Sequence, residues 1–91
     1  PEAMFLLGNI YIEGNELIEK DLKKSIKCFE FSSFNGNHFA SHKLGLIYFF
    51  GEGEIERNIF KSSHYFEKSI EKGNIVDSYY FLGKLYSEKE S

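Results

Sequence analysis

The 91-residue chain has 42% hydrophobic and 27% charged residues and a net charge of −3, a composition typical of a folded domain rather than a disordered segment. Its 11 basic residues are scattered, which argues against a nucleic-acid partner, because such proteins need a basic surface for phosphate contacts. The apolar runs are far shorter than the ~20 residues of a membrane helix, so we expect no membrane insertion by this segment.

Five helices are predicted in chain order, because apolar and small residues recur at helical rather than alternating spacing. Ala3, Leu7 and Tyr11, for example, fall at i, i+4 and i+8. We expect the helices to cover residues 2–13, 20–35, 38–50, 58–72 and 76–88.

Capping residues stand at the ends of these segments. A short polar side chain can accept hydrogen bonds from the free amides of a first turn, and the candidate N-caps are Asp21, Asn37 and Asn58. Glycine adopts the left-handed conformation after a helix without a Cβ penalty, and the candidate C-terminal glycines are Gly14, Gly36, Gly51 and Gly73.

An internal repeat runs through the whole chain. The segment Leu7-Gly8-Asn9-Ile10-Tyr11 has counterparts that begin 37 residues later at Leu44 and a further 38 residues later at Leu82. A small residue stands four positions before each leucine, at Ala3, Ala40 and Ser78. A second set returns 37 positions later in the same order: Ser25, Phe29, Gly36 and Asn37, then Ser62, Phe66, Gly73 and Asn74.

The shared period predicts an all-α, superhelical α/α repeat solenoid of about two and a half helix-turn-helix repeats. Repeat 1 covers residues 1–37, repeat 2 covers 38–74, and half repeat 3 covers 75–91. We expect Leu7, Leu44 and Leu82 to occupy equivalent buried sites. A glycine follows each of them inside a helix, where it costs up to about 1 kcal/mol relative to alanine, so we expect these glycines to permit close helix contacts.

These motifs resemble the Sel-one-like repeat, a relative of the tetratricopeptide repeat. That family places a small residue, Leu-Gly and Tyr on helix A, and an aromatic pair and a closing Gly on helix B. The second copy matches the pattern best, at Ala40, Leu44-Gly45, Tyr48, Gly51-Glu52-Gly53, Ile55, Ser62, Tyr65-Phe66, Lys68-Ser69 and Gly73-Asn74. The period exceeds the 34 residues of a tetratricopeptide array, and the extra residues fall between the helices.

The resemblance implies a scaffold or adaptor that binds a peptide or partner protein, with helix A lining a concave groove and helix B the convex side. The stripe of helix A that does not contain the repeated small residue, Leu-Gly and Tyr would then face the groove. Its residues are Phe5, Asn9, Ile12, His42, Leu46, Phe49, Tyr80 and Lys84. These residues either contact a partner or pack on the next repeat, and the sequence leaves both interpretations open. An alternative is a regulatory or substrate-docking segment of a larger enzyme.

No catalytic, cofactor-binding or metal-binding residue is predicted. His38 and His42 share a helix face but lack a third ligand, and Ser69 opens a Ser-x-x-Lys pattern without its companion motifs. Cys28 has no nearby catalytic partner in the sequence, so we expect a buried apolar side chain. A lone cysteine excludes an intrachain disulfide and favours an intracellular location, while the resemblance leaves the endoplasmic-reticulum lumen open.

The third copy contains only a helix A. Its residues Tyr79, Phe81 and Leu85 cannot all be covered by the preceding helix pair. Because each unit of a solenoid buries its face against its neighbours, we expect further repeats or a partner to cover this terminal helix.

Overall fold

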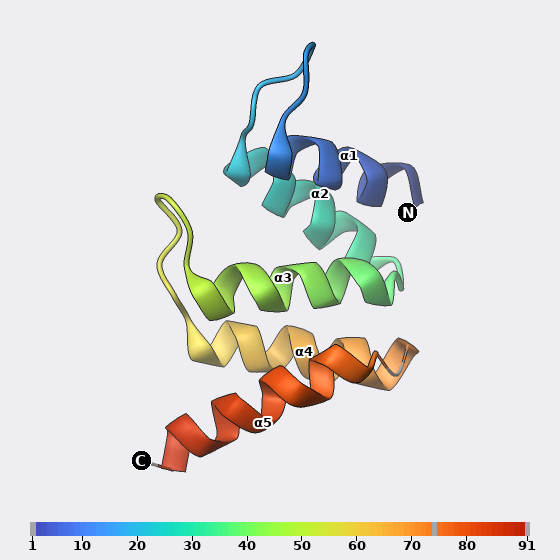
Figure 1. The fold of residues 1–91 in the computed structure, drawn as a ribbon. Coiled ribbons are helices and arrows are strands. Elements are labelled where there is room, and N and C mark those ends of the chain that lie inside the picture. The colour runs from blue at the N-terminus through green and yellow to red at the C-terminus, as the bar shows by residue number, and fades with distance from the viewer. Residues whose placement is uncertain (1, 74, 91) are drawn as a thin grey trace.

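The computed structural model describes residues 2–73 and 75–90, so Pro1, Ser91 and the Asn74 of the second Gly-Asn pair lie outside the described residues. The described residues form five helices and no strand (Figure 1). The helices are α1 (Glu2–Glu13), α2 (Leu22–Phe34), α3 (His38–Phe50), α4 (Ile59–Gly73) and α5 (Val76–Glu90). The predicted bounds differ from these by at most two residues, and the predicted all-α repeat fold is confirmed.

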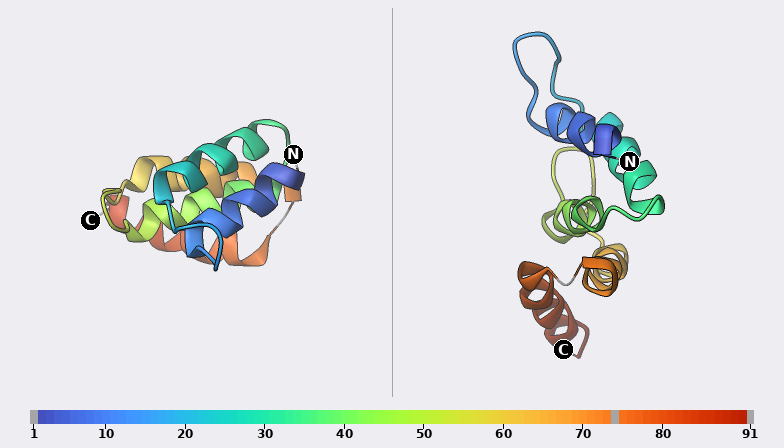
Figure 2. Two further views of the ribbon diagram at one scale, coloured as in Figure 1. Left: turned by 90° about the horizontal axis from the view of Figure 1, so that it is seen from above. Right: turned by 90° about the vertical axis from the view of Figure 1, so that its right-hand side faces the viewer.

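The helices stack in chain order into an elongated body of 44 × 27 × 17 Å, in which each helix packs against its neighbours in sequence. Figure 2 shows that α1, α3 and α5 lie along one side of the stack and that α2 and α4 lie along the other. The first three are helix A of their repeats, and the last two are helix B. In Figure 1 the loop between α1 and α2 projects at the top of the stack, and the loop between α3 and α4 projects at its left side.

The predicted N-caps are confirmed. The side chains of Asp21, Asn37 and Asn58 accept hydrogen bonds of 3.0–3.1 Å from backbone amides three residues later. In both complete repeats helix A then ends at a glycine with positive φ, 76° at Gly14 and 64° at Gly51. At both glycines the returning loop passes too close for a side chain, because an added Cβ would lie within 2.8 Å of a backbone nitrogen.

The two helices of a repeat meet through the same contact in both complete copies. In repeat 2, a Cβ on Gly45 would lie 2.6 Å from the ring of Phe66, so only glycine lets the ring approach this closely. The hydroxyl of Ser62 donates a hydrogen bond of 2.8 Å to the carbonyl oxygen of Gly45. The equivalent residues of repeat 1 form the same contact: Gly8, Ser25 and Phe29. The predicted role of these two glycines is therefore confirmed.

The prediction of equal burial holds for only two of the three repeated leucines. Leu44 and Leu82 are buried, whereas Leu7 is only partly buried. Leu44 is covered because α2 packs against α3. Among the described residues no helix precedes α1, so the corresponding side of α1 lacks this cover. For the same reason Ala3 is exposed, whereas its counterpart Ala40 is fully buried.

Candidate functional site

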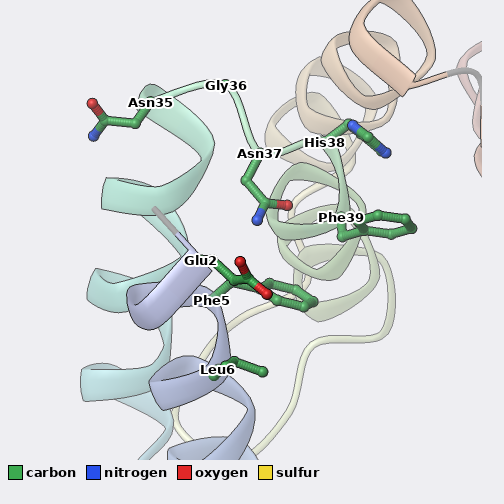
Figure 3. Close-up of a pocket in the computed structure, with 8 residues that line it drawn as sticks. All are labelled: Glu2, Phe5, Leu6, Asn35, Gly36, Asn37, His38 and Phe39. Atoms are coloured by element: carbon green, nitrogen blue, oxygen red, sulfur yellow. The ribbon is translucent and has the colours of Figure 1, made fainter.

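The side of the stack formed by α1, α3 and α5, here called the A-helix face, carries the residues that the sequence singled out for binding (Figure 2). Three hollows lie between neighbouring helices A or beside them on this face, and a fourth lies on α1 alone. The largest, of about 490 Å³, lies between the N-terminal halves of α1 and α3 (Figure 3). Its lining residues are Glu2, Phe5, Leu6, Asn35, Gly36, Asn37, His38 and Phe39.

Phe5 forms the inner wall of this hollow. Its ring lies 5.9 Å from the buried ring of Phe29 and 6.2 Å from the ring of Phe39, and it packs against the apolar core that includes Phe29 and Leu44. Leu6 and Phe39 are both more than half exposed beside it. The hollow therefore offers an apolar wall that is anchored in the core and edged by two accessible apolar side chains.

A second hollow, of about 200 Å³, brings together two of the predicted residues, Ile12 of α1 and Leu46 of α3. Phe50 and the charged side chains of Lys43 and Glu52 complete much of its wall. A third, of about 280 Å³, joins the predicted pair Phe49 and Lys84 with Ser87 and Glu88.

On α3, four of the lining residues form one stripe, here called the α3 stripe: Phe39, Lys43, Leu46 and Phe50. Their spacing of four, three and four residues places them on a single helix face. Phe39 is 54% and Phe50 64% exposed, which is unusual for rings of this size. Phe39 and Phe50 are eleven positions apart, which corresponds to about 16 Å along the helix.

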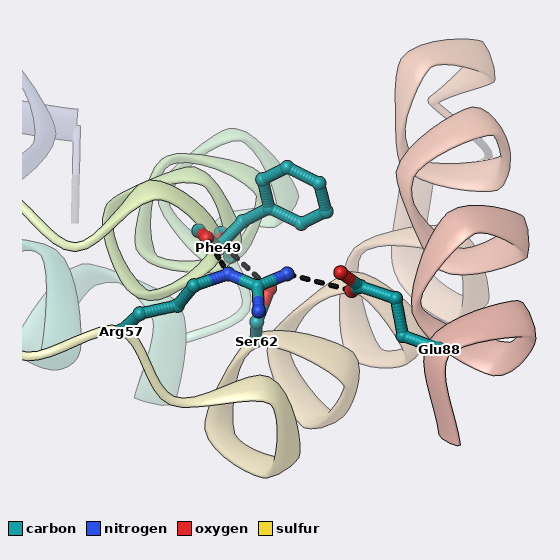
Figure 4. A network of polar contacts seen from close by, with 5 residues as sticks. Phe49, Arg57, Ser62 and Glu88 are labelled. Carbon is teal, nitrogen blue, oxygen red and sulfur yellow. Dashed lines mark hydrogen bonds and ion pairs between the residues drawn. The ribbon is translucent and has the colours of Figure 1, made fainter. Parts of the chain in front are cut away.

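Phe49 lies one residue away from this stripe and packs between the repeats. Its ring makes an edge-on contact with Phe81 of α5, with centroids 4.9 Å apart. Arg57 lies over the same ring, donates a hydrogen bond of 2.7 Å to the Phe49 carbonyl oxygen, and forms a 2.6 Å ion pair with Glu88 (Figure 4). Phe49 therefore joins α3 to α5 more than it faces a groove.

His42 also lies in this contact between α3 and α5, here called the α3–α5 seam. Its Nδ1 atom lies 2.7 Å from the hydroxyl of Ser78 in α5, and its ring lies 5.6 Å from that of Phe66. Burial lowers the pKa of His42; the nearby Asp77 carboxylate opposes this shift and Lys43 adds to it. His38 lies elsewhere, against Gly73 at the end of α4, so the two histidines have different partners.

The three other predicted residues lie at the surface or near it. Asn9 is partly buried and lines a shallow hollow on α1 with Leu6 and Ile10. Tyr80 and Lys84 are exposed on α5, where the Lys84 ammonium lies 5.2 Å from the centre of the Tyr80 ring.

Four surface residues of the A-helix face lie outside the predicted stripe: Leu6, Phe39, Lys43 and Phe50. The predicted stripe followed the positions of Phe5 and His42, which are equivalent in the repeat and lie partly buried between neighbouring A helices. On α3 the accessible stripe shares Leu46 with the predicted one but contains Lys43 and Phe50 in place of His42 and Phe49, and each replacement lies one residue, or about 100°, further around the helix. The sequence signal for this accessible stripe is the presence of two phenylalanines at helical spacing on one face of the helix, with a lysine between them.

One polar cluster resembles a catalytic arrangement. The hydroxyl of Ser78 lies 2.7 Å from His42 and 2.9 Å from the hydroxyl of Ser69. Both serines have no exposed surface, so no substrate can reach either oxygen. The cluster links α3, α4 and α5 through a satisfied hydrogen-bond chain.

Cys28 is buried on α2, as predicted, and burial raises the pKa of its thiol, which disfavours the nucleophilic thiolate. Within residues 2–73 and 75–90, no three His, Cys, Asp or Glu side chains are grouped as metal ligands would be. None of the described helices is long and apolar enough to cross a membrane.

The geometry defines an α/α repeat solenoid in which the two helices of each complete repeat pack through a glycine of helix A and a serine and a phenylalanine of helix B. The sequence profile of the Sel1 repeat matches residues 1–33 and 38–74, and the chain belongs to this family, the Sel-one-like repeats. Repeats of this family generally serve as protein-interaction modules rather than as catalysts. The profile match does not extend over residues 75–91, where the half repeat rests on Leu82-Gly83 and on α5.

Among solved structures, the fold is similar to that of a Sel1 repeat protein from Oxalobacter formigenes, with a TM-score of 0.78 and 24% sequence identity. The match covers 97% of this chain and 64% of that one, so this chain spans less than two thirds of its structural relative. A search of curated proteins finds no match.

Proposed function

We propose that this chain binds an apolar segment of a partner protein along the A-helix face, with the α3 stripe at the centre of the contact. The observation that carries the proposal is the pair Phe39 and Phe50, two exposed rings on one helix face, each beside a hollow. Exposed aromatic side chains next to concave surface are typical of interaction sites.

The two rings are spaced for a short peptide. Their separation of about 16 Å matches two anchors roughly five residues apart in an extended segment. Fully burying a phenylalanine side chain contributes about 1.5–3 kcal/mol, so two anchors supply a useful share of a micromolar affinity. Phe5, Ile12 and Leu46 form the walls that the anchors meet.

Charges of both signs surround the stripe. Glu2 borders the larger hollow, and Lys43 and Glu52 border the smaller one. We therefore expect binding to depend on apolar burial more than on salt. Asn9, Tyr80 and Lys84 extend the surface toward its two ends, while His42 and Phe49 hold the α3–α5 seam on which the surface rests.

The proposal can be tested with peptides selected from a phage-displayed random library against the 91-residue chain. The affinity of each selected peptide is then measured by fluorescence anisotropy for the chain and for Phe39→Ala, Phe50→Ala and Phe31→Ala. Phe31 is the matched control, because it is 53% exposed but lies on α2, a helix B. We expect the first two substitutions to weaken binding by about tenfold or more and Phe31→Ala to have little effect.

The opposite pattern would refute the proposal. If selected peptides lose affinity with Phe31→Ala and keep it with Phe39→Ala and Phe50→Ala, the binding surface lies on the helix-B side. Circular dichroism of each variant checks that its helical content is unchanged.

A further inference from the structure

Lys43 is the only lysine or arginine of α1 and α3, and it lies within the α3 stripe. It stands four residues after Phe39 and seven before Phe50, which corresponds to about 6 Å and about 10 Å along the helix. Together with Ile12 and Leu46 it lines the smaller hollow between α1 and α3. A single positive charge therefore lies between the two exposed rings of the stripe.

Other lysines of the chain have partners that Lys43 lacks. Lys24 and Lys61 each lie over a tyrosine ring, and Lys20 forms an ion pair of 3.6 Å with Glu52. Glu52 also borders the smaller hollow, but neither it nor any other described carboxylate forms an ion pair with the Lys43 ammonium. The charge of Lys43 is therefore available to a ligand.

The surroundings of Lys43 favour a role in selecting the ligand. The side chain is partly buried in a hollow that apolar residues line, and a lysine in such a place covers apolar surface with its stem and keeps its ammonium at the water. An ion pair formed there is screened by salt less than a fully exposed pair. Such a charge distinguishes between ligands more than it adds affinity, because the wrong sign is repelled.

We propose that Lys43 selects partner segments that carry an aspartate or a glutamate between two apolar anchors. This selectivity rests on the proposed function, since the anchors are the apolar side chains that meet Phe39 and Phe50. An extended segment advances about 3.3 Å per residue, so the acidic residue stands about two residues from the anchor at Phe39 and about three from the anchor at Phe50. Its carboxylate accepts a hydrogen bond from the Lys43 ammonium.

The test begins with the peptides selected from the phage-displayed library. Those whose binding depends on Phe39 and Phe50 should carry an acidic residue between two apolar ones. For a fluorescent copy of one such peptide, Lys43→Glu in the chain should weaken binding by about tenfold or more. Lys68→Glu is the matched control, because Lys68 is also partly buried but lies on α4, a helix B, and it should have little effect.

A second measurement exchanges the two charges. A peptide whose acidic residue is replaced by lysine should bind the wild-type chain about tenfold more weakly and should regain affinity for Lys43→Glu. Lys43→Gln, which removes the charge without reversing it, should weaken the original peptide severalfold. This milder variant replaces Lys43→Glu if circular dichroism shows that the charge reversal lowers the helical content.

Two results would overturn the proposal: selected peptides without an acidic residue between their apolar residues, and a charge exchange that restores no affinity. In both cases Phe39→Ala and Phe50→Ala still weaken binding if the proposed function is correct, so the two failures can be told apart. Selected peptides that bind equally well to Phe39→Ala and Phe50→Ala would refute the proposed function and, with it, the selectivity of Lys43.

Discussion

Ser62 donates a hydrogen bond to the carbonyl oxygen of Gly45, 17 residues earlier, and so ties helix B of repeat 2 to the middle of its helix A. Four residues further along α4, the ring of Phe66 covers the same glycine. Gly45, which has no side chain, therefore takes part in both a polar and an apolar contact with helix B. Because repeat 1 has the same pair of contacts at Gly8, this relationship is a property of the repeat itself.

Gly45→Ala should destabilise the protein, although alanine is the better helix former. The added Cβ would lie 2.6 Å from the buried ring of Phe66, and overpacking of this kind costs about 1–3 kcal/mol. Gly83→Ala is the matched control. With no described atom near the new methyl group, it should stabilise α5 by up to about 1 kcal/mol. Urea unfolding of both variants measures the difference, and equal effects would show that packing does not distinguish the two sites.

Ser33 and Ser41 should show non-additive effects on stability. Their hydroxyls lie 2.6 Å apart between α2 and α3, and both residues are buried. Either single change to alanine leaves the remaining hydroxyl without this partner, which costs about 1–3 kcal/mol. The double variant removes both hydroxyls, so its loss should be smaller than the sum of the single losses. A double-mutant cycle by chemical denaturation measures the coupling, and strict additivity would show that the pair does not act as a unit.

Leu44, Phe49 and Phe50 should rank in that order in their contribution to stability. Leu44 is fully buried, so its change to alanine should cost about 2–5 kcal/mol. Phe49 is partly buried against Phe81, so its truncation should have an intermediate cost. Phe50 is 64% exposed, and the change of Phe50 to alanine should cost less than about 1 kcal/mol. Thermal unfolding checks the order. If Phe49→Ala proves as mild as Phe50→Ala, Phe49 belongs to the groove and not to the seam.

Stability should fall as the pH is lowered through the titration of His42. Burial holds the pKa of this side chain below its value in the unfolded chain, so the unfolded state takes up the proton first. The contribution is complete above the unfolded pKa and is lost as the pH falls from there toward the lower folded pKa. Asp77 limits the effect, because its carboxylate favours the charged imidazole.

The measurement compares urea unfolding at about pH 7.5 and about pH 5.5 for the wild type and for His42→Asn, which keeps a polar group near Ser78. The wild type should lose more stability between these pH values than the variant does. An equal loss in both proteins would assign the pH dependence to other groups.

The sequence by itself determined the helices, their N-caps and the internal contact of each complete repeat, whereas Gly73, expected to follow α4 in the left-handed conformation, is the last residue of that helix and has no positive φ. These features are local or repeated: the Asn37 side chain caps a helix by accepting from the backbone amide of Ala40, three residues later, and Gly45 marks a close contact because the same cost recurs at Gly8. Periodicity carries such information directly, since residues four apart on a helix must share a face.

Only the tertiary structure decided which side of each helix A is accessible. Phe49 and Phe50 are adjacent in sequence and about 100° apart around α3. The path of α5 determines that Phe49 is partly buried against Phe81, whereas Phe50, whose ring lies 5.9 Å from that of Phe81, stays 64% exposed. In the same way, Gly45 and Gly83 are equivalent in the repeat, but only Gly45 has a ring above it. The burial of a residue depends on which element packs against it. Equivalent positions of a repeat are therefore equally buried only where the element that packs against them is repeated as well.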